Sequence, residues 1–539
     1  MSERLLPPRA ADDVPPDRVD ATDVGGEHRG IATDRRARLD GLLTARPWVG
    51  LAIASGVAVV AGLVLGLTMP RGPLTGPQAL VGIAVVVPVG FVAGVALRSR
   101  WAMLLAPVAF VVTVELVRLP VPGPLVDAPD LSVLGLVALV LGRGVDAVLL
   151  LFPMVLGATY GAAAARRWWP GVTVGDPPSR IWSVVRRVVT GLLTVGLVAL
   201  VVGVAQPART APIEGGDGQP LAGSVAELST VELGGHEQSL MIRGVRDDAP
   251  VLLWLAGGPG GSDIGAMRLS GQRLEEAFVV VTWDQRGTGR SYGALDPAET
   301  LTFEQAVADT LELTAHLRER FGQERIYLAG NSWGTLPGVV AVQQRPEWFH
   351  AYVGAGQMVN LRATDELFYE DTLVDARERG DAALEATLSE LGPPPYDDFL
   401  DYYAGVFGGE QRWNDYDRVP GSAANSEMPG TLRVAEYDLV AKARTGAATL
   451  DTLGVLYAKV EAVDLRALAP RLEVPVYLVQ GRHEARGRAE LADAWFAQLE
   501  APSKERIVFE RSGHRPMFEE PDRFVEVMTE QVLRADAPA

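Results

Sequence analysis

Five long apolar runs lie in the first 205 residues, and they constrain the fold more than any other feature of the sequence. The runs occupy approximately residues 48–69, 78–97, 101–119, 131–165 and 184–205. A helix needs about 20 apolar residues to cross the hydrocarbon core of a bilayer, and most of these runs approach that length. The sequence therefore predicts a membrane region over residues 48–205 with about five transmembrane helices.

The fourth run, of 35 residues, is too long for one simple span. Gly142-Arg143-Gly144 interrupts it. We therefore expect a break there, with Val145–Ala165 as the span and Leu131–Leu141 as a re-entrant, interfacial or extending segment.

Two ionisable pairs, Glu115/Arg118 and Arg143/Asp146, lie close to the predicted ends or the break of these spans. Residues three apart share one face of a helix, so each pair can interact. Charges inside a membrane can mark a functional site, but their position near span ends favours a structural role.

The arginine residues of this half fall mainly in alternate loops. They precede the first span, separate the second from the third, and separate the fourth from the fifth, whereas the other loops carry only Arg71 and Arg118. Because positive charge marks cytoplasmic loops, the N-terminus is predicted to be cytoplasmic and the chain after about residue 206 extracytoplasmic. A sixth crossing by Leu131–Leu141 would instead leave the C-terminal half in the cytoplasm.

Charge divides the chain at the same place as hydropathy. Residues 1–207 hold 18 Lys and Arg against 14 Asp and Glu, whereas the remainder holds 31 against 53. An acidic soluble half argues against a nucleic-acid partner, because phosphate binding needs a basic surface. The chain has no cysteine, which excludes disulfides, thiolate nucleophiles and cysteine metal sites.

Four segments follow from these patterns: a disordered cytoplasmic tail (1–47), the membrane region (48–205), a linker rich in Pro and Gly (206–230), and a soluble domain (231–535). In the soluble domain, short apolar runs alternate with helical stretches such as Phe303–Phe321, which predicts an α/β fold with a mostly parallel sheet covered by helices. The strand candidates are Val231–Leu233, Leu240–Arg243, Val251–Ala256, Phe278–Trp283, Ile326–Ala329, Ala351–Gly354, Val476–Gln480 and Arg506–Phe509.

Ser332 is the candidate nucleophile. It lies in Gly330-Asn331-Ser332-Trp333-Gly334, directly after an apolar strand and before a helix start. In this strand–turn–helix context, a strained turn presents the serine hydroxyl above the strand ends, and the flanking glycines permit close approach of the backbone.

A serine nucleophile needs a base and an acid that orients the base. With the chain order serine, acid, histidine, His514 is the candidate base because it follows the last predicted strand. Glu484 is the candidate acid because it follows the strand before that one; Asp493 and Glu490 are the alternatives.

The developing oxyanion needs backbone N–H donors. The glycine-rich turn that follows Val251–Ala256 offers Gly257 and Gly258, and Trp333 offers the amide after the nucleophile. A phosphate-binding loop is rejected, because the turn lacks both the Lys-Ser/Thr ending and the dinucleotide spacing.

These motifs together resemble the prolyl iminopeptidase family of serine aminopeptidases. The resemblance covers about residues 230–535 and is carried by Leu255–Gly261, Trp283–Ser291, Gly330–Gly334, Gly481–Glu484 and Ser512–His514. Two positions depart from the family pattern. Ala256 stands where the family usually has His, and Glu484 stands where it usually has Asp, which weakens any transfer of substrate specificity.

The resemblance implies an α/β-hydrolase fold with a helical cap, here at about residues 357–465. In aminopeptidases of this family, cap carboxylates bind the free amine of the substrate. Glu366 and Glu370 lie four apart early in this insertion and so share one helix face. They are candidates for that role, although an exposed helix face is the more common explanation of such a pair.

The resulting hypothesis is a membrane-anchored serine hydrolase with a Ser-His-Glu triad, acting on short peptides with a free N-terminus. It needs neither metal nor organic cofactor, and the sequence does not identify any protein partner. One alternative is an esterase or lipase with the same triad and a different cap pocket. A second is a membrane sensor or binding protein without catalytic activity.

Overall fold

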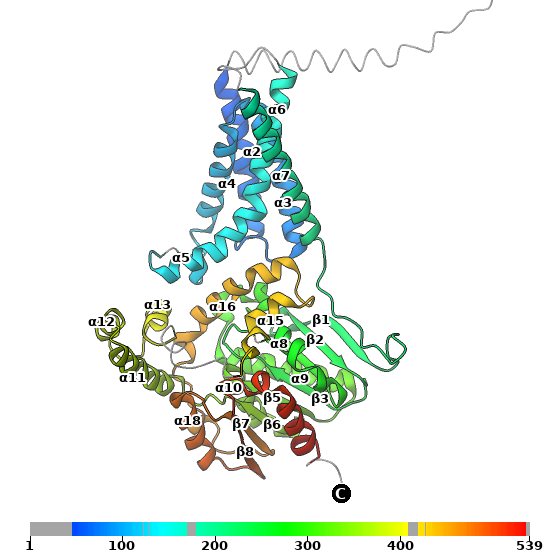
Figure 1. Cartoon of the computed structure of the whole chain (residues 1–539), viewed down its shortest axis with the longest axis vertical. Helices are drawn as coiled ribbons and strands as arrows, with labels where there is room; N and C mark the ends of the chain where they lie inside the picture. Colours follow the sequence, from blue (N-terminus) through cyan, green and yellow to red (C-terminus); the bar gives the residue numbers. More distant parts are fainter. Residues whose placement is uncertain are drawn as a thin grey trace, which may run out of the picture.

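The computed structural model of the chain is elongated, with a helical bundle at one end and a helix-covered sheet at the other (Figure 1). It describes residues 46–121, 123–128, 130–169, 179–407, 419–425 and 427–534. The predicted disordered tail, residues 1–47, lies outside the described residues apart from its last two.

The bundle contains helices α2, α3, α4, α6 and α7, with α5 leading into α6 (Figure 1). Their bounds are α2 Pro47–Thr68, α3 Gly76–Leu97, α4 Ala102–Arg118, α5 Val133–Leu139, α6 Phe152–Trp168 and α7 Arg180–Val204. Within the described residues, four helices are long and apolar enough to cross a membrane: Pro47–Thr68, Gly76–Leu97, Val133–Trp168 and Arg180–Val204. The third predicted span corresponds to α4, which has 17 residues and is shorter than these four.

The predicted break at Gly142-Arg143-Gly144 is wrong. Val133–Trp168 is one helix of 36 residues, in which Val140–Gly144 and Ala147–Leu151 form π-helical turns. A π turn absorbs an extra residue without ending the helix. A Cβ added to Gly142 would lie 3.1 Å from Val126 Cβ, so this glycine permits close packing of a neighbouring segment rather than a break.

Helices α3 and α6 pack with almost no space between their backbones. A Cβ on Gly90 or Gly94 of α3 would lie 2.0 or 2.3 Å from a carbonyl oxygen of α6. Gly157 and Gly161 of α6 face α3 in the same way, at 2.2 and 2.0 Å. Small residues spaced four apart allow membrane helices to approach this closely. The high glycine content of the apolar runs therefore has a packing role.

The sheet has eight strands in the order β1-β2-β4-β3-β5-β6-β7-β8. The pairs β1–β2 and β2–β4 are antiparallel and all the others are parallel. The predicted mostly parallel sheet is thereby confirmed, and every strand candidate overlaps a strand, with only Ala256 and Phe278 lying one residue outside. The bounds are β1 Val225–Leu233, β2 His236–Gly244, β3 Val251–Leu255, β4 Val279–Asp284, β5 Ile326–Asn331, β6 Phe349–Ala355, β7 Val476–Gly481 and β8 Lys504–Phe509.

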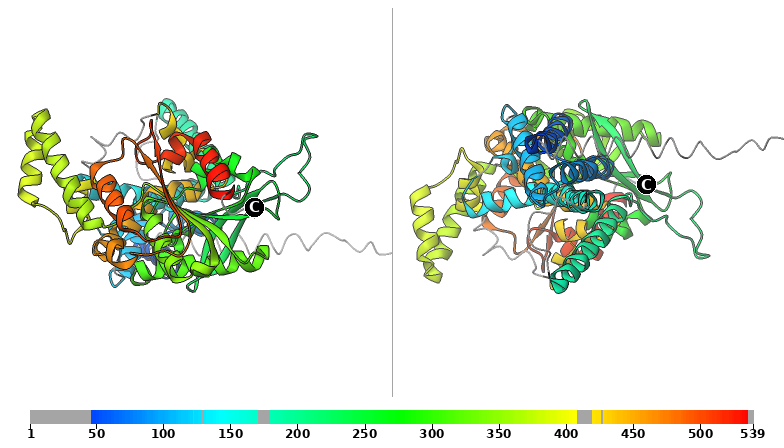
Figure 2. Two further views of the ribbon diagram at one scale, coloured as in Figure 1. Left: turned by 90° about the horizontal axis from the view of Figure 1, so that it is seen from below. Right: turned by 90° about the horizontal axis from the view of Figure 1, so that it is seen from above.

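Helices cover both faces of the sheet (Figure 2). Successive side chains of a strand point to opposite faces. In β3, Leu253 packs in one core with α9 (Phe303–Phe321) and α10 (Thr335–Gln344), whereas Trp254 packs in the other with α8 (Ile264–Ser270). Since both faces are covered, the central strands appear in sequence as unbroken apolar runs.

The predicted helix Phe303–Phe321 coincides with α9, and its ends have clear local causes. The Thr302 side chain accepts a hydrogen bond from the Gln305 amide and caps the N-terminus. Gly322 ends the helix in the left-handed conformation, with φ of 62°.

The chain between β6 and β7 forms the cap. Its described helices are α11 Leu361–Arg379, α12 Ala382–Leu391, α13 Phe399–Tyr402, α15 Glu427–Arg433, α16 Leu439–Val460 and α17 Leu465–Leu468. Helix α16 lies between the helical bundle and the sheet (Figure 1).

One side of α16 is bonded to the bundle. The Arg444 guanidinium pairs with Asp146 and donates to the Gly142 carbonyl oxygen at 3.2 Å. Farther along α16, Asp451 accepts a hydrogen bond from Arg71 Nη1 at 3.2 Å. These ion pairs connect the cap to two separate parts of the bundle.

The same helix also contacts two loops at the strand ends. The Thr449 hydroxyl donates to the Gly260 carbonyl oxygen at 3.1 Å, in the loop after β3. The Thr452 hydroxyl donates to the Gly287 carbonyl oxygen at 2.7 Å, in the loop after β4. A single cap helix therefore touches both the bundle and the loops that follow β3 and β4.

The glycine contacts predict that two glycine-to-alanine substitutions in the bundle have very different effects on the free energy of unfolding. Gly161→Ala should destabilise the full chain by about 1–3 kcal/mol, because its Cβ would collide with the Phe91 carbonyl oxygen. Gly196→Ala on α7 has nothing within 4 Å and should be neutral or slightly stabilising. Thermal unfolding of both variants in detergent measures the difference, and equal unfolding temperatures would contradict the tight packing of α3 and α6.

Candidate active site

Ser332 directly follows β5 and is the first residue of the 3-10 turn Ser332–Gly334, which continues into α10. Its φ is 49°, a left-handed value that non-glycine residues rarely adopt. Among the described residues, only Arg98 shares a positive φ without being glycine. Backbone strain of this kind persists where the surrounding structure holds it, which is typical of functional sites.

The two glycines of the motif are required by space. A Cβ on Gly330 would lie 2.8 Å from the backbone of Gly334, and a Cβ on Gly334 would lie 2.3 Å from the Leu255 carbonyl oxygen. The turn therefore packs directly against its own start and against β3. These contacts fix the position of Ser332 relative to the sheet.

His514 and Glu484 are in direct contact. His514 follows β8 and Glu484 follows β7, and the distance from His514 Nδ1 to Glu484 Oε2 is 2.7 Å. The alternative acids lie elsewhere, since Asp493 pairs with Arg506 and Glu490 is exposed. Of the three carboxylates considered, Glu484 is the one that contacts the imidazole.

Arg488 completes the environment of this carboxylate. Its Nε donates to Glu484 Oε1 at 2.9 Å, and the Ala485 amide donates to the same oxygen at 2.9 Å. Burial raises the pKa of Glu484, but Arg488 and His514 outweigh that effect and hold the pKa below its usual value, at about 2. The carboxylate is therefore ionised at neutral pH, so His514 Nδ1 is the donor and the lone pair of the imidazole lies on Nε2.

Gly356 provides the space that the imidazole occupies. It follows β6 with φ of 56°, and a Cβ there would lie 2.9 Å from His514 Nδ1. A larger residue would displace the ring. Sequence reasoning missed both Gly356 and Arg488; Arg488 lies in the first turn of the helix that begins at Arg486, whereas Glu484 precedes that helix.

The loop after β3 lies against Ser332. A Cβ on Gly257 would be 3.4 Å from Ser332 Cβ, so the glycine-rich turn is within van der Waals distance of the serine. Gly258 and Gly260 have φ of 135° and 88°, conformations that require glycine. The structure thus brings together Gly257, the Ser332 turn and, as the next residue, Trp333.

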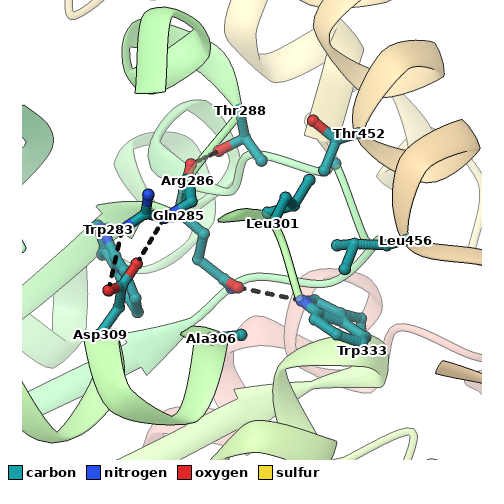
Figure 3. Close-up of a pocket in the computed structure, with 11 residues that line it drawn as sticks. Trp283, Gln285, Arg286, Thr288, Leu301, Ala306, Asp309, Trp333, Thr452 and Leu456 are labelled. Carbon is teal, nitrogen blue, oxygen red and sulfur yellow. Dashed lines mark hydrogen bonds and ion pairs between the residues drawn. The ribbon is translucent and has the colours of Figure 1, made fainter. Parts of the chain in front are cut away.

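Gln285 connects this loop to the serine turn. Its Nε2 donates to the Ala256 carbonyl oxygen at 3.1 Å. Its Oε1 accepts from Trp333 Nε1 at 3.0 Å (Figure 3). One buried side chain therefore holds both segments that carry the predicted oxyanion donors. The sequence showed Gln285 only as part of a motif, without this role.

Its neighbours in the motif anchor the same loop to other elements. Burial raises the pKa of Asp284, which accepts hydrogen bonds from the Arg290 amide at 2.8 Å and the Tyr437 hydroxyl at 2.7 Å. Arg286 donates to Asp309 of α9 at 3.0 Å. The three residues of the Asp-Gln-Arg motif thus connect the loop after β4 to Tyr437, to α9 and to the serine turn.

A cavity of about 10 Å³ lies beside Trp333, bordered by Gln285, Thr452 and Leu456 (Figure 3). This volume is at most that of one water molecule, so it is a packing space and offers no room for a substrate. Within the described residues, no group of three or more His, Asp or Glu side chains could hold a metal ion.

Glu366 and Glu370, the candidate amine ligands, lie on helix α11 of the cap. They do share a face of α11, but it is the exposed one, and Glu370 pairs with Arg486 at 3.0 Å. The carboxylate on the buried side of this helix is Asp365, which accepts a hydrogen bond from the Tyr457 hydroxyl at 3.2 Å. Helical spacing placed the pair on one face correctly but gave no information on which face was buried.

Residues 251–527 match the family described as the alpha/beta hydrolase family. This match covers more than half of the chain. The chain belongs to the alpha/beta hydrolase family. Its membership agrees with the parallel sheet, the strained serine turn and the helical insertion before β7.

Several relatives of this alpha/beta hydrolase are known. The chain is 29% identical over 314 residues to the probable aminopeptidase YbaC of Bacillus subtilis (strain 168), which spans 57% of this chain and 96% of the relative. It is 30% identical over 223 residues to the putative carbamate hydrolase RutD of Variovorax paradoxus (strain S110), spanning 39% and 74%. It is 36% identical over 94 residues to a proline iminopeptidase of Lactobacillus delbrueckii subsp. lactis, spanning 17% and 31%.

The Gln285 contacts predict that one substitution will affect both stability and turnover in this hydrolase. Gln285→Leu leaves the Ala256 carbonyl and the Trp333 indole N–H unsatisfied, at about 1–3 kcal/mol each. We expect a lower unfolding temperature and slower hydrolysis of p-nitrophenyl acetate by the folded fraction. Gln272→Leu, at an exposed position, is the matched control, and equal behaviour of the two variants would refute the role of Gln285.

Proposed function

We propose that this alpha/beta hydrolase is a membrane-anchored serine aminopeptidase that cleaves short peptides with a free N-terminus. The observation that carries the proposal is the buried contact between His514 and Glu484, 2.7 Å long, in a fold whose strained serine turn packs against a glycine-rich loop. Serine hydrolysis requires a base with a fixed tautomer, a serine hydroxyl that faces the substrate, and backbone N–H donors for the oxyanion.

In the proposed mechanism, Ser332 Oγ attacks the acyl carbon while His514 Nε2 takes the hydroxyl proton. The ionised Glu484 holds Nδ1–H and stabilises the imidazolium. Backbone amides of Gly257, Gly258 and Trp333 are the proposed donors to the oxyanion. His514 then protonates the leaving amine, and a water molecule, deprotonated by His514, releases the acyl group from Ser332.

The aminopeptidase activity is supported by the relatives rather than by a defined amine site. The relative that is covered over 96% of its length carries the name probable aminopeptidase, and a shorter match is to a proline iminopeptidase. Glu366 and Glu370 are not retained as amine ligands, because their face of α11 is exposed. Esterase activity with the same triad remains the second candidate, since the triad chemistry does not select between an amide and an ester.

Membrane anchoring is supported by the four long apolar helices. We propose that α4 is a fifth span, because its 17 residues reach the lower limit of about 17 for a crossing helix. Five crossings, with arginines in alternate loops, would put the N-terminus in the cytoplasm and the hydrolase domain outside.

Substrate assays on the full chain in detergent test the chemistry. Aminoacyl p-nitroanilides with a free amine should be turned over faster than their N-acetylated forms and faster than p-nitrophenyl esters. Ser332→Ala should reduce turnover roughly a thousandfold or more and abolish fluorophosphonate labelling, whereas Ser503→Ala should change neither. Hydrolysis of esters alone, without benefit from a free amine, would establish the esterase, and a folded chain that never labels would favour a binding protein.

The absence of cysteine allows a clean test of orientation. We expect Ser503→Cys, on the exposed surface of the hydrolase domain, to react with a membrane-impermeant maleimide in intact cells. Ser99→Cys, between α3 and α4, should react only after the cells are permeabilised. The reverse pattern would place the hydrolase domain in the cytoplasm.

A further inference from the structure

The two oxygens of the Glu484 carboxylate have different partners. Oε2 lies 2.7 Å from His514 Nδ1, whereas Oε1 accepts hydrogen bonds from Arg488 Nε and from the Ala485 amide, both at 2.9 Å. A glutamate has one more rotatable bond between backbone and carboxylate than an aspartate, and that freedom must be removed if the second oxygen is to keep its place. The contacts at Oε1 hold the carboxylate so that Oε2 faces the imidazole.

Arg488 is itself held in place by the cap. It lies in the first turn of α18 (Arg486–Gln498), and the centre of its guanidinium lies 4.8 Å from the centroid of the Phe368 ring of α11. The two helices touch next to this contact, because a Cβ on Gly487 would lie 2.8 Å from the Thr364 carbonyl oxygen. The guanidinium is therefore fixed between a cap helix and the carboxylate.

Charge balance gives Arg488 a second effect on the pair formed by Glu484 and His514. The side chains of Arg488 and Glu484 are 5% and 2% exposed, so solvent ions screen their interaction weakly. The guanidinium is always charged, whereas the imidazole is cationic only after it takes a proton. Without Arg488, a protonated His514 would be the side-chain cation bonded to this carboxylate, and the pair would bind its proton more tightly.

Other charged or titratable side chains lie on the elements around the pair. Glu519 of α19 (Pro516–Glu519) is buried and accepts a hydrogen bond from the Arg515 amide at 3.2 Å. The Arg515 guanidinium pairs with Glu427 of α15 at 2.6 Å. On the cap side, Asp365 of α11 accepts from a tyrosine hydroxyl at 3.2 Å, and His483 beside Glu484 is exposed. All of these groups are retained in a variant of Arg488, so they are common to both pH profiles.

We propose that Arg488 is a positioning residue for the serine hydrolysis. It fixes Glu484 so that one oxygen meets His514, and it balances the charge of the carboxylate so that the imidazole releases its proton and serves again as a base. The inference rests on the proposed function and adds to it a side chain that acts through Glu484.

The rate constant of fluorophosphonate labelling of the full chain in detergent, measured as a function of pH, tests the role. A rate constant does not depend on how much of a variant is folded. In Arg488→Met the pair keeps its proton more tightly, so the acid limb of the profile should move to higher pH by about one unit or more. A lower rate at all pH values with an unmoved acid limb would show a merely structural role and overturn the proposal.

Two further arginine variants separate charge from shape. Arg488→Lys keeps the positive charge, so its acid limb should remain close to that of the wild type. Arg486→Met removes a guanidinium from the same turn of α18, but Arg486 is 39% exposed and pairs with Asp371. Its profile should match that of the wild type. An acid limb that moves equally in Arg486→Met and Arg488→Met, or that Arg488→Lys does not restore, would overturn the charge-balance role.

Glu484→Asp tests the positioning role without removing any charge, so the result does not depend on whether Arg488→Met folds. An aspartate is one methylene shorter and cannot keep the contacts to both Arg488 and His514 unless the backbone moves. We expect labelling at the plateau to slow by about tenfold or more, because small displacements of a catalytic group are costly. Wild-type labelling by this variant would overturn the proposal.

Failure of this inference differs from failure of the proposed function. A folded wild-type chain that never labels would contradict serine hydrolysis and the role of Arg488 with it. A wild type that labels, together with an unmoved acid limb in Arg488→Met, would contradict the role of Arg488 alone.

Discussion

The ion pairs between α16 and the helical bundle are the interactions on which the arrangement of the whole chain depends. Asp451 is buried, and it accepts hydrogen bonds from Arg71, from the Val126 amide at 2.8 Å and from the Tyr292 hydroxyl at 2.7 Å. Burial raises the pKa of Asp451 to about 6 even though these three partners each lower it. Removing one partner of a buried ion pair commonly costs about 3–5 kcal/mol, so the relative position of bundle and cap is strongly determined.

The parts of the fold that the sequence could predict are those dictated by local pattern. Strands buried on both faces appear as apolar runs, and α9 was predicted to the residue because Thr302 and Gly322 mark its ends. The chain order of Ser332, Glu484 and His514 identified side chains of which the last two are in contact in the structure. Local chemistry and strand order were sufficient for these residues because each lies directly after a strand.

The parts that could not be predicted depend on contacts distant in sequence. The space for the imidazole comes from Gly356, more than 150 residues before His514, and no local pattern marks it. The hydrogen bonds that support the loop after β3 come from Gln285 and from Thr449 of the cap. The predicted break at Gly142 was wrong for a related reason. A glycine in an apolar run can mark either a break or a close contact, and here only the contact with Val126 distinguishes the two.

The position of α16 also limits how a substrate can reach the serine. This helix forms a roof over the loops after β3 and β4, and the bundle lies directly above the roof (Figure 1). With the bundle in a bilayer, approach along the membrane normal is blocked from above. On the proposed membrane anchoring, molecules would reach the serine from the side, between the bundle end and the sheet. Such a geometry would favour small flexible molecules over folded proteins, whatever the chemistry of the bond that is cleaved.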